Sequence, residues 1–225
     1  MQTPSGSASH RTRPTSSPLA LTACLIALSA FSGVAKGAVL TGPALVKELK
    51  NGGYVLVMRH AQSPDARPTA SEAKPDNPAR ERQLDMQGEA SAKVLGQALR
   101  KLAVPIGQIY CSPTYRARET IRLAGLQRPQ LVMALAEGSK GMRGAAEAAQ
   151  VQWLRVAVTE PPAQGTNTLI VTHTPNIAGA FGTPTADIKA GEMIVFRPAP
   201  ATAGGAVVGR ITVAQWQKLA MGSGF

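Results

Sequence analysis

The chain has 225 residues and a formal net charge of +11, because 24 lysines and arginines outnumber 13 acidic residues. It contains only two cysteines, which excludes a disulfide-stapled scaffold. Aromatic residues make up 4% of the chain and do not alternate with a basic stripe, as they would on a nucleic-acid-binding surface. We therefore expect a small phosphorylated substrate, drawn in by the positive field, and no nucleic-acid partner.

Residues 1–37 are predicted to be a secretory signal peptide. They contain no acidic residue, carry two early arginines, run apolar over residues 19–31 and end in the small-residue pattern around Lys36. The 13-residue apolar run is shorter than the roughly 20 residues that span a bilayer, so no stable membrane insertion is expected after cleavage. The sequence thus predicts export from a bacterial cytoplasm to the periplasm or medium. Lipid anchoring at Cys24 is the weaker alternative, because the apolar run continues past that residue.

Residues 38–225 are predicted to form one domain. Loss of the leader removes three basic residues and no acidic one, which lowers the net charge from +11 to +8. It also leaves Cys111 as the remaining cysteine, so no internal disulfide can form. We expect Cys111 to be a small buried side chain at a strand end and not a nucleophile.

The first half of this domain begins with a predicted helix over residues 43–49, and a continuous apolar run predicts a buried strand over 54–58. Residues 62–84 have no period and are rich in proline, alanine and charge. We expect this segment, called the 62–84 excursion, to be a functional lid over the sheet edge. Asp85 is then the expected N-cap of a helix that ends near residue 102.

The second half continues to alternate strands with helices. Ser112 is the expected N-cap of a helix that runs to residue 126, with Pro113 in its first position, and Thr174-Pro175 repeats this arrangement. Strands are predicted over residues 108–111, 169–172, 193–196 and 206–213, helices over 141–158 and 174–181, and a short apolar segment over 131–135. This alternation predicts a three-layer α/β/α sandwich with a mostly parallel sheet.

Charged side chains follow three of the predicted strands. Arg59 and His60 follow the first, Arg116 lies in the first turn of the helix after the second, and His173 follows the third. Parallel sheets bind ligands beyond the carboxyl ends of their strands, and helix N-termini there attract anions. Arginines suit phosphoryl oxygens and disfavour the imidazolium form, so a neutral histidine is available to attack phosphorus.

These residues resemble the motifs of the histidine phosphatase superfamily, also called phosphoglycerate-mutase-like. Arg59-His60-Ala61 is similar to its Arg-His-Gly signature, Ser112 to Thr120 to its Ser-Pro-x-x-Arg-Ala-x-x-Thr, and His173 ends its later strand; the resemblance covers residues 52–197. It implies a phosphoglycerate-mutase-like fold without metal or cofactor. It also implies that His60 is the phosphorylated nucleophile, that Arg59 and Arg116 bind phosphate and that His173 completes the site.

Several departures narrow the subfamily. Ala61 stands where the family has glycine, which removes some backbone freedom. Residues 62–65 lack the Trp-Asn of the sugar-phosphate mutases, and Ser63 and Thr174 depart from the phytase-like branch. The chain therefore resembles a small exported bacterial member of branch 1.

The general acid has three candidates. Glu137 is similar to the family's Leu-x-Glu proton donor, Glu192 precedes a predicted strand, and Asp65 lies on the 62–84 excursion. Asn176 is a candidate substrate contact, although an asparagine that pins its own loop explains it as well.

We accordingly expect a metal-independent phosphomonoester hydrolase that acts through a phosphohistidine at His60. A non-catalytic phosphate- or partner-binding protein on the same fold is the alternative. A zinc hydrolase that uses His60, His173 and a carboxylate is disfavoured, because two arginines would repel the cation and no paired-ligand spacing is present. No pattern specifies the natural substrate or the oligomeric state.

Overall fold

A six-stranded sheet in the order β3-β2-β4-β1-β5-β6 forms the middle layer of the molecule. The computed structural model describes residues 39–137, 144–199 and 205–222, which all belong to the unit Gly37–Phe225. The strands are β1 (Val55–Arg59), β2 (Ile106–Cys111), β3 (Gln130–Leu131), β4 (Asn167–Thr172), β5 (Met193–Arg197) and β6 (Ala206–Ile211). Pairs among β1 to β4 are parallel, whereas β5 and β6 join antiparallel, which confirms the mostly parallel sheet.

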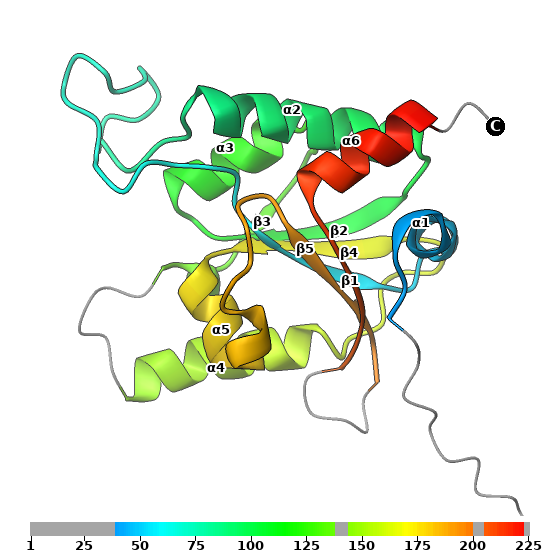
Figure 1. The fold of residues 1–225 in the computed structure, drawn as a ribbon. Helices are drawn as coiled ribbons and strands as arrows, with labels where there is room; N and C mark the ends of the chain where they lie inside the picture. Colours follow the sequence, from blue (N-terminus) through cyan, green and yellow to red (C-terminus); the bar gives the residue numbers. More distant parts are fainter. Residues whose placement is uncertain (1–38, 138–143, 200–204, 223–225) are drawn as a thin grey trace, which may run out of the picture. The chain divides into compact units, whose positions relative to one another are not determined.

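Helices cover both faces of this sheet, so the predicted three-layer α/β/α sandwich is confirmed (Figure 1). One face carries α1 (Gly42–Asn51), α2 (Met86–Lys101), α3 (Tyr115–Leu123) and α6 (Val213–Gly222). The other carries α4 (Ala145–Ala157) and α5 (Thr174–Phe181), and two 3₁₀ turns, Met133–Leu135 and Thr183–Thr185, lie in the connections. β1 shows why both faces are covered, since successive side chains of a strand point to opposite sides.

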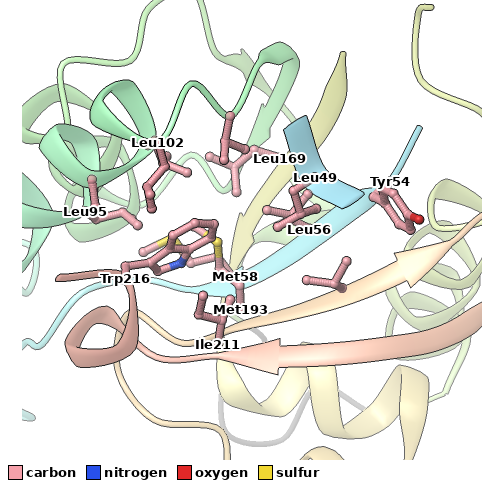
Figure 2. Packing of buried hydrophobic residues seen from close by; sticks show 14 of the residues in the cluster. Leu49, Tyr54, Leu56, Met58, Leu95, Leu102, Leu169, Met193, Ile211 and Trp216 are labelled. Atoms are coloured by element: carbon pink, nitrogen blue, oxygen red, sulfur yellow. The ribbon is translucent and has the colours of Figure 1, made fainter. Parts of the chain in front are cut away.

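Two apolar clusters lie on opposite faces of the sheet, and alternate residues of β1 belong to one or the other. Leu56 and Met58 pack with α1, α2 and α6, whereas Val55 and Val57 pack with α4 and α5. Figure 2 shows the first cluster, in which the Trp216 ring lies beside Met58 and below Leu95 and Leu102. Burial on both sides explains why the strand is an unbroken apolar run.

The start of α3 differs from the prediction. Ser112 and Pro113 lie before the helix, Thr114 flanks it, and Tyr115 is its first residue. The Ser112 hydroxyl instead contacts His173, and the Tyr115 N–H donates to the Glu81 carboxylate at 2.9 Å. A carboxylate from a distant part of the chain thus supplies the cap that was expected from Ser112.

Helix α6 was not predicted, and the last strand ends at Ile211 instead of residue 213. A capping box begins the helix. The Thr212 N–H donates to Gln215 Oε1 at 2.8 Å, and the Gln215 N–H donates to Thr212 Oγ1 at 3.3 Å. The Thr-x-x-Gln spacing was therefore a readable signal for this helix.

The 62–84 excursion is held against α2 and α3. Lys74 forms an ion pair with Glu89 of α2, and the Tyr115 hydroxyl donates to Asp76 at 2.6 Å. At its base the Asp85 N–H donates to the Gln62 carbonyl at 3.3 Å. The predicted cap of α2 is confirmed, since Asp85 Oδ1 accepts from the Gly88 N–H at 2.7 Å. These contacts fix the excursion beside the first turn of α3.

Two predictions about the leader fall outside the described residues, namely the signal peptide of residues 1–37 and the lipidation site at Cys24. Across residues 39–137, 144–199 and 205–222, no helix is long and apolar enough to cross a membrane. Cys111 is buried at the end of β2, and burial raises the pKa of its thiol to about 12. This confirms Cys111 as a packed side chain.

Candidate active site

The carboxyl ends of β2, β4 and β1 meet at one edge of the sheet, where they bring the predicted site residues together. Arg59 is the last residue of β1 and pairs with Thr172 at the end of β4. His60 and His173 follow these two strands, and their ring centroids are 5.1 Å apart. Arg116 is the second residue of α3, which starts just beyond β2.

Arg116 connects the two histidines. Its Nε donates to His60 Nε2 at 3.1 Å, and its Nη2 donates to His173 Nδ1 at 3.0 Å. The same Nη2 donates to Glu137 Oε2 at 2.6 Å. Since the Arg116 side chain is only 4% exposed, these contacts form a preorganised cluster of two imidazoles and one guanidinium.

The hydrogen bonds of His60 define its tautomer. Its Nδ1 is 2.7 Å from the Ala61 carbonyl, which can only accept, so Nδ1 carries the proton. Its Nε2 faces Arg116, which can only donate, so Nε2 carries the lone pair. The ring is therefore neutral and presents an unprotonated nitrogen to the cluster.

His173 is neutral for the same reason, with the opposite arrangement of its nitrogens. Its Nδ1 accepts from Arg116, and its Nε2 lies 2.9 Å from the Ser112 hydroxyl and 3.4 Å from the Thr114 hydroxyl. A hydroxyl both donates and accepts, so this tautomer can be reversed without losing the hydrogen bond to Ser112. Such a reversal gives His173 a proton on Nδ1, where it can be donated to a bound oxygen.

Burial is the main reason why both rings stay neutral. It lowers the pKa of His60 to about 3, with Arg116, Arg59 and Arg82 adding repulsion. Burial also lowers the pKa of His173 to about 2, and the neighbouring His60 and Arg116 act in the same direction. Desolvation likewise lowers the pKa of Arg116, which remains a cation.

The loop after β1 is tied to α3 through Thr120. The Thr120 hydroxyl accepts from the Ala61 N–H at 3.0 Å and donates to the Arg116 carbonyl at 2.8 Å. Ala61 does not adopt a left-handed backbone conformation, so the missing glycine costs no strain here. Thr120, the last residue of the second motif, thus ties the loop that contains His60 and Ala61 to α3 and Arg116.

Arg59 lies on the β5 side of the cluster. Its Nη1 donates to the Ile188 carbonyl at 3.0 Å, in the loop that precedes β5. The positive charge of Arg59 helps to lower the pKa of both histidines, so Arg59 is close enough to interact with them electrostatically. The structure therefore brings Arg59, His60, Arg116 and His173 together as the sequence predicted.

The three candidate acids have different surroundings. Glu137 contacts Arg116 directly and is about one-third exposed. The Glu192 carboxylate is held by Arg210 Nε at 2.9 Å and by the Lys189 N–H at 2.8 Å, which fixes the turn before β5. Asp65 is fully exposed and pairs with Arg82. Glu137 is thus the carboxylate in direct contact with the cluster.

Asn176 pins the segment that leads to Glu137. Its amide nitrogen donates to the Ala136 carbonyl at 3.0 Å and lies 3.5 Å from the Ala134 carbonyl. Its Oδ1 is buried without a partner among the described residues. The structure therefore gives Asn176 a positioning contact with the chain before Glu137, and the predicted substrate contact stays a prediction.

The sequence reasoning missed Arg82 and Glu81, two neighbours on the 62–84 excursion. Glu81 caps α3, as described above, and Arg82 Nη1 lies 3.8 Å from Glu137 Oε2. Neither residue lies in a periodic element or near a motif in the sequence. Only the folded excursion brings them to the cluster.

Within the described parts of the chain, no group of three or more histidine, cysteine, aspartate and glutamate side chains could hold a metal ion. The cluster instead combines neutral nitrogen bases with arginines, an arrangement that suits a phosphoryl dianion.

Comparison with known families gives a match over residues 55–143 to the model of the histidine phosphatase superfamily (branch 1). This range contains Arg59, His60, Arg116 and Glu137, and His173 lies beyond its end. No curated protein sequence matches the chain.

Solved structures give matches over most of the described chain. A mutant phosphoserine phosphatase of Entamoeba histolytica in complex with phosphoserine is 13% identical, with a TM-score of 0.50 and coverage of 72% of this chain and 98% of that chain. SixA, a protein histidine phosphatase complexed with tungstate, is 16% identical, with a TM-score of 0.49 and coverage of 72% and 97%. At 13% identity, the likeness to the phosphoserine phosphatase shows a shared fold.

Proposed function

Because residues 55–143 match the model of the histidine phosphatase superfamily (branch 1), we propose that this chain is a metal-independent phosphomonoester hydrolase with His60 as its nucleophile. The observation that carries the proposal is the lone pair on His60 Nε2, which is buried, unprotonated and beside Arg116. Its substrate is a small phosphorylated molecule.

In the first step, His60 Nε2 attacks phosphorus, so that the N–P bond forms while the bond to the leaving oxygen breaks. Arg59 and Arg116 neutralise the equatorial oxygens, and His173 donates a hydrogen bond to one of them after its tautomer reverses. Arg116 must turn its donors from the histidines and Glu137 toward the phosphoryl group. The departing oxygen needs a proton, which Glu137 is placed to supply.

Glu137 can become a proton donor because a bound substrate replaces it as the hydrogen-bond partner of Arg116. It is ion-paired with Arg116 in the structure described here. A phosphoryl group bound to Arg116 releases the carboxylate, which can then hold the proton that the leaving oxygen receives. In the second step the ionised Glu137 accepts a proton from water, which attacks phosphorus and breaks the N–P bond.

The charges of the cluster support the proposed metal independence. Arg59 and Arg116 already supply the positive charge that phosphoryl transfer requires, and a divalent cation among them would be repelled. A neutral imidazole also needs no metal to become a nucleophile.

The test is turnover of phenyl phosphate by residues 38–225 in the presence of a chelator, for the wild type and His60→Ala, over pH 4 to 8. We expect chelator-resistant turnover that His60→Ala abolishes, and a phosphorylated histidine trapped by rapid quenching of the wild type. Circular dichroism verifies that the variant is folded.

Two outcomes would contradict the proposal. Turnover that a chelator removes would favour a metal hydrolase. Binding of inorganic phosphate by folded wild type without turnover of any phosphomonoester would favour the alternative of a non-catalytic phosphate- or partner-binding protein, in which Glu137 only holds Arg116.

Export is part of the same proposal and is supported by the sequence of residues 1–37. Mass spectrometry of the periplasmic and secreted fractions of a bacterial host tests it. A mature chain of about 188 residues is expected from cleavage after the 37-residue leader. A lipid-modified Cys24 at the new N-terminus would instead show a lipoprotein.

A further inference from the structure

Arg82 is anchored by two of its three guanidinium nitrogens. Its Nε donates to the Pro64 carbonyl at 2.7 Å, and its Nη2 donates to Asp65 Oδ1 at 3.0 Å and to the Ser63 carbonyl at 3.3 Å. The side chain is 19% exposed. Residues 63–65, near the start of the 62–84 excursion, thus hold the guanidinium in one orientation.

The third nitrogen, Nη1, is directed at the active site. It makes no hydrogen bond to the described residues, and it lies 3.8 Å from Glu137 Oε2. The same carboxylate oxygen accepts from Arg116 Nη2 at 2.6 Å. Arg82 and Arg116 therefore both face this carboxylate oxygen, and the charge of Arg82 reaches both rings.

The position of Arg82 relative to Glu137 indicates which part of a substrate Arg82 would contact. If Glu137 protonates the leaving oxygen, it lies on the leaving-group side of the phosphoryl group. Arg82 Nη1, which faces this carboxylate, is then close to the leaving group. Because Arg82 is already ordered, binding an anion there costs little conformational entropy.

We propose that Arg82 is a specificity-determining residue that selects phosphomonoesters whose leaving group carries a second anionic group, such as a carboxylate. The inference rests on the proposed function, because it uses Glu137 to define the leaving-group side. Arg82 contacts the substrate through Nη1, while Nε and Nη2 keep their anchors to the excursion.

The experiment compares phenyl phosphate with its 2-, 3- and 4-carboxyphenyl analogues at pH 7, for wild type, Arg82→Gln and Arg67→Gln. Arg67 is the matched control, because it is an exposed arginine of the same excursion, and its replacement changes the net charge equally. We expect kcat/KM of the wild type to be about tenfold higher for at least one carboxylated ester, the gain of a charge-assisted hydrogen bond. Arg82→Gln should remove this preference and Arg67→Gln should retain it.

Phenyl phosphate, whose leaving group carries no carboxylate, separates the loss of a substrate contact from disorder of the excursion. Loss of turnover for all four esters in Arg82→Gln, with an equal ratio between them, would mean that Arg82 only anchors the chain, and would overturn the inference. Equal kcat/KM for all four esters in the wild type would overturn it as well.

A binding measurement keeps this test separate from that of the proposed function. The non-hydrolysable benzylphosphonate and its carboxylated analogues are titrated calorimetrically against the same three proteins. Tighter binding of a carboxylated analogue that Arg82→Gln removes supports the role of Arg82 even without turnover, whereas equal Kd values refute it. Absence of turnover of every ester concerns the proposed function alone.

Discussion

At the scale of single residues, the contact between Glu137 and Arg116 is the one on which the proposed chemistry depends. If Glu137 is the proton donor, Glu137→Gln slows phenyl phosphate hydrolysis by about 10²- to 10⁴-fold, because this leaving group needs a proton. It should hardly change hydrolysis of 2,4-dinitrophenyl phosphate, whose leaving group departs as a stable anion. Steady-state kcat values for both esters provide the measurement.

The same pair of substrates identifies the opposite case. Equal losses for both esters in Glu137→Gln would mean that Glu137 orients Arg116 and does not move a proton. Asp65→Asn serves as a comparison, because this exposed carboxylate was also a candidate acid and contacts Arg82, not Arg116. A leaving-group dependence in Asp65→Asn but not in Glu137→Gln would reassign the acid.

At the scale of elements, the contact between the 62–84 excursion and α3 is a helix cap supplied from a distance. Glu81→Ala leaves the Tyr115 N–H without its acceptor and removes a negative charge from a helix N-terminus. We expect the free energy of unfolding in urea to fall by about 1 kcal/mol. Glu72→Ala is the control, because among described residues this exposed carboxylate contacts only Thr69. An equal effect of the two variants would show that Glu81 does not cap α3.

The elements also show which features a sequence can predict. β1 and β4 were recognised because strands buried on both faces are unbroken apolar runs. α6 was missed although Thr212 and Gln215 form a readable capping box, because the preceding strand was extended to residue 213. The motif residues Arg59, His60, Arg116 and His173 were found because each lies at the end of a strand or in the first turn of the helix that comes after it.

Arg82 and Glu81 could not be found in this way, because their positions depend on tertiary contacts. Arg82 is fixed by Asp65, 17 residues earlier, and Glu81 contacts Tyr115, 34 residues later. The 62–84 excursion has no hydrophobic period from which its path could be predicted. Local sequence thus identifies the cluster of histidines and arginines but not the residues that surround it.

At the scale of the whole molecule, the two buried neutral histidines make folding depend on pH. Their pKa values are about 3 and about 2 in the folded chain, below the ordinary value of 6.5. Between these values the unfolded chain binds more protons than the folded chain. The contribution of the two neutral histidines to the free energy of unfolding is therefore fully present above pH 6.5 and is lost as the pH decreases toward 3. Each histidine contributes at most about 1.4 kcal/mol per pH unit.

Urea unfolding at pH 7.5, 6.0 and 5.0 measures this dependence. His173→Asn removes one of the two groups, so the loss of stability per pH unit should be about half that of the wild type, whatever the stability of the variant at pH 7.5. An unchanged slope would mean that His173 is charged in the folded chain.

The base of the 62–84 excursion has a consequence for how such a protein can diversify. The segment leaves and rejoins the fold at the Gln62 carbonyl and the Asp85 N–H, which are hydrogen-bonded, and Gly88 lies so close to Gln62 that a side chain would not fit there. Everything between these points is an insert with a fixed entrance and exit. Its length and composition can change as long as Glu81 keeps the cap on α3, the helix that carries Arg116. A change of substrate preference can therefore be confined to this one segment, while the residues of the cluster stay the same.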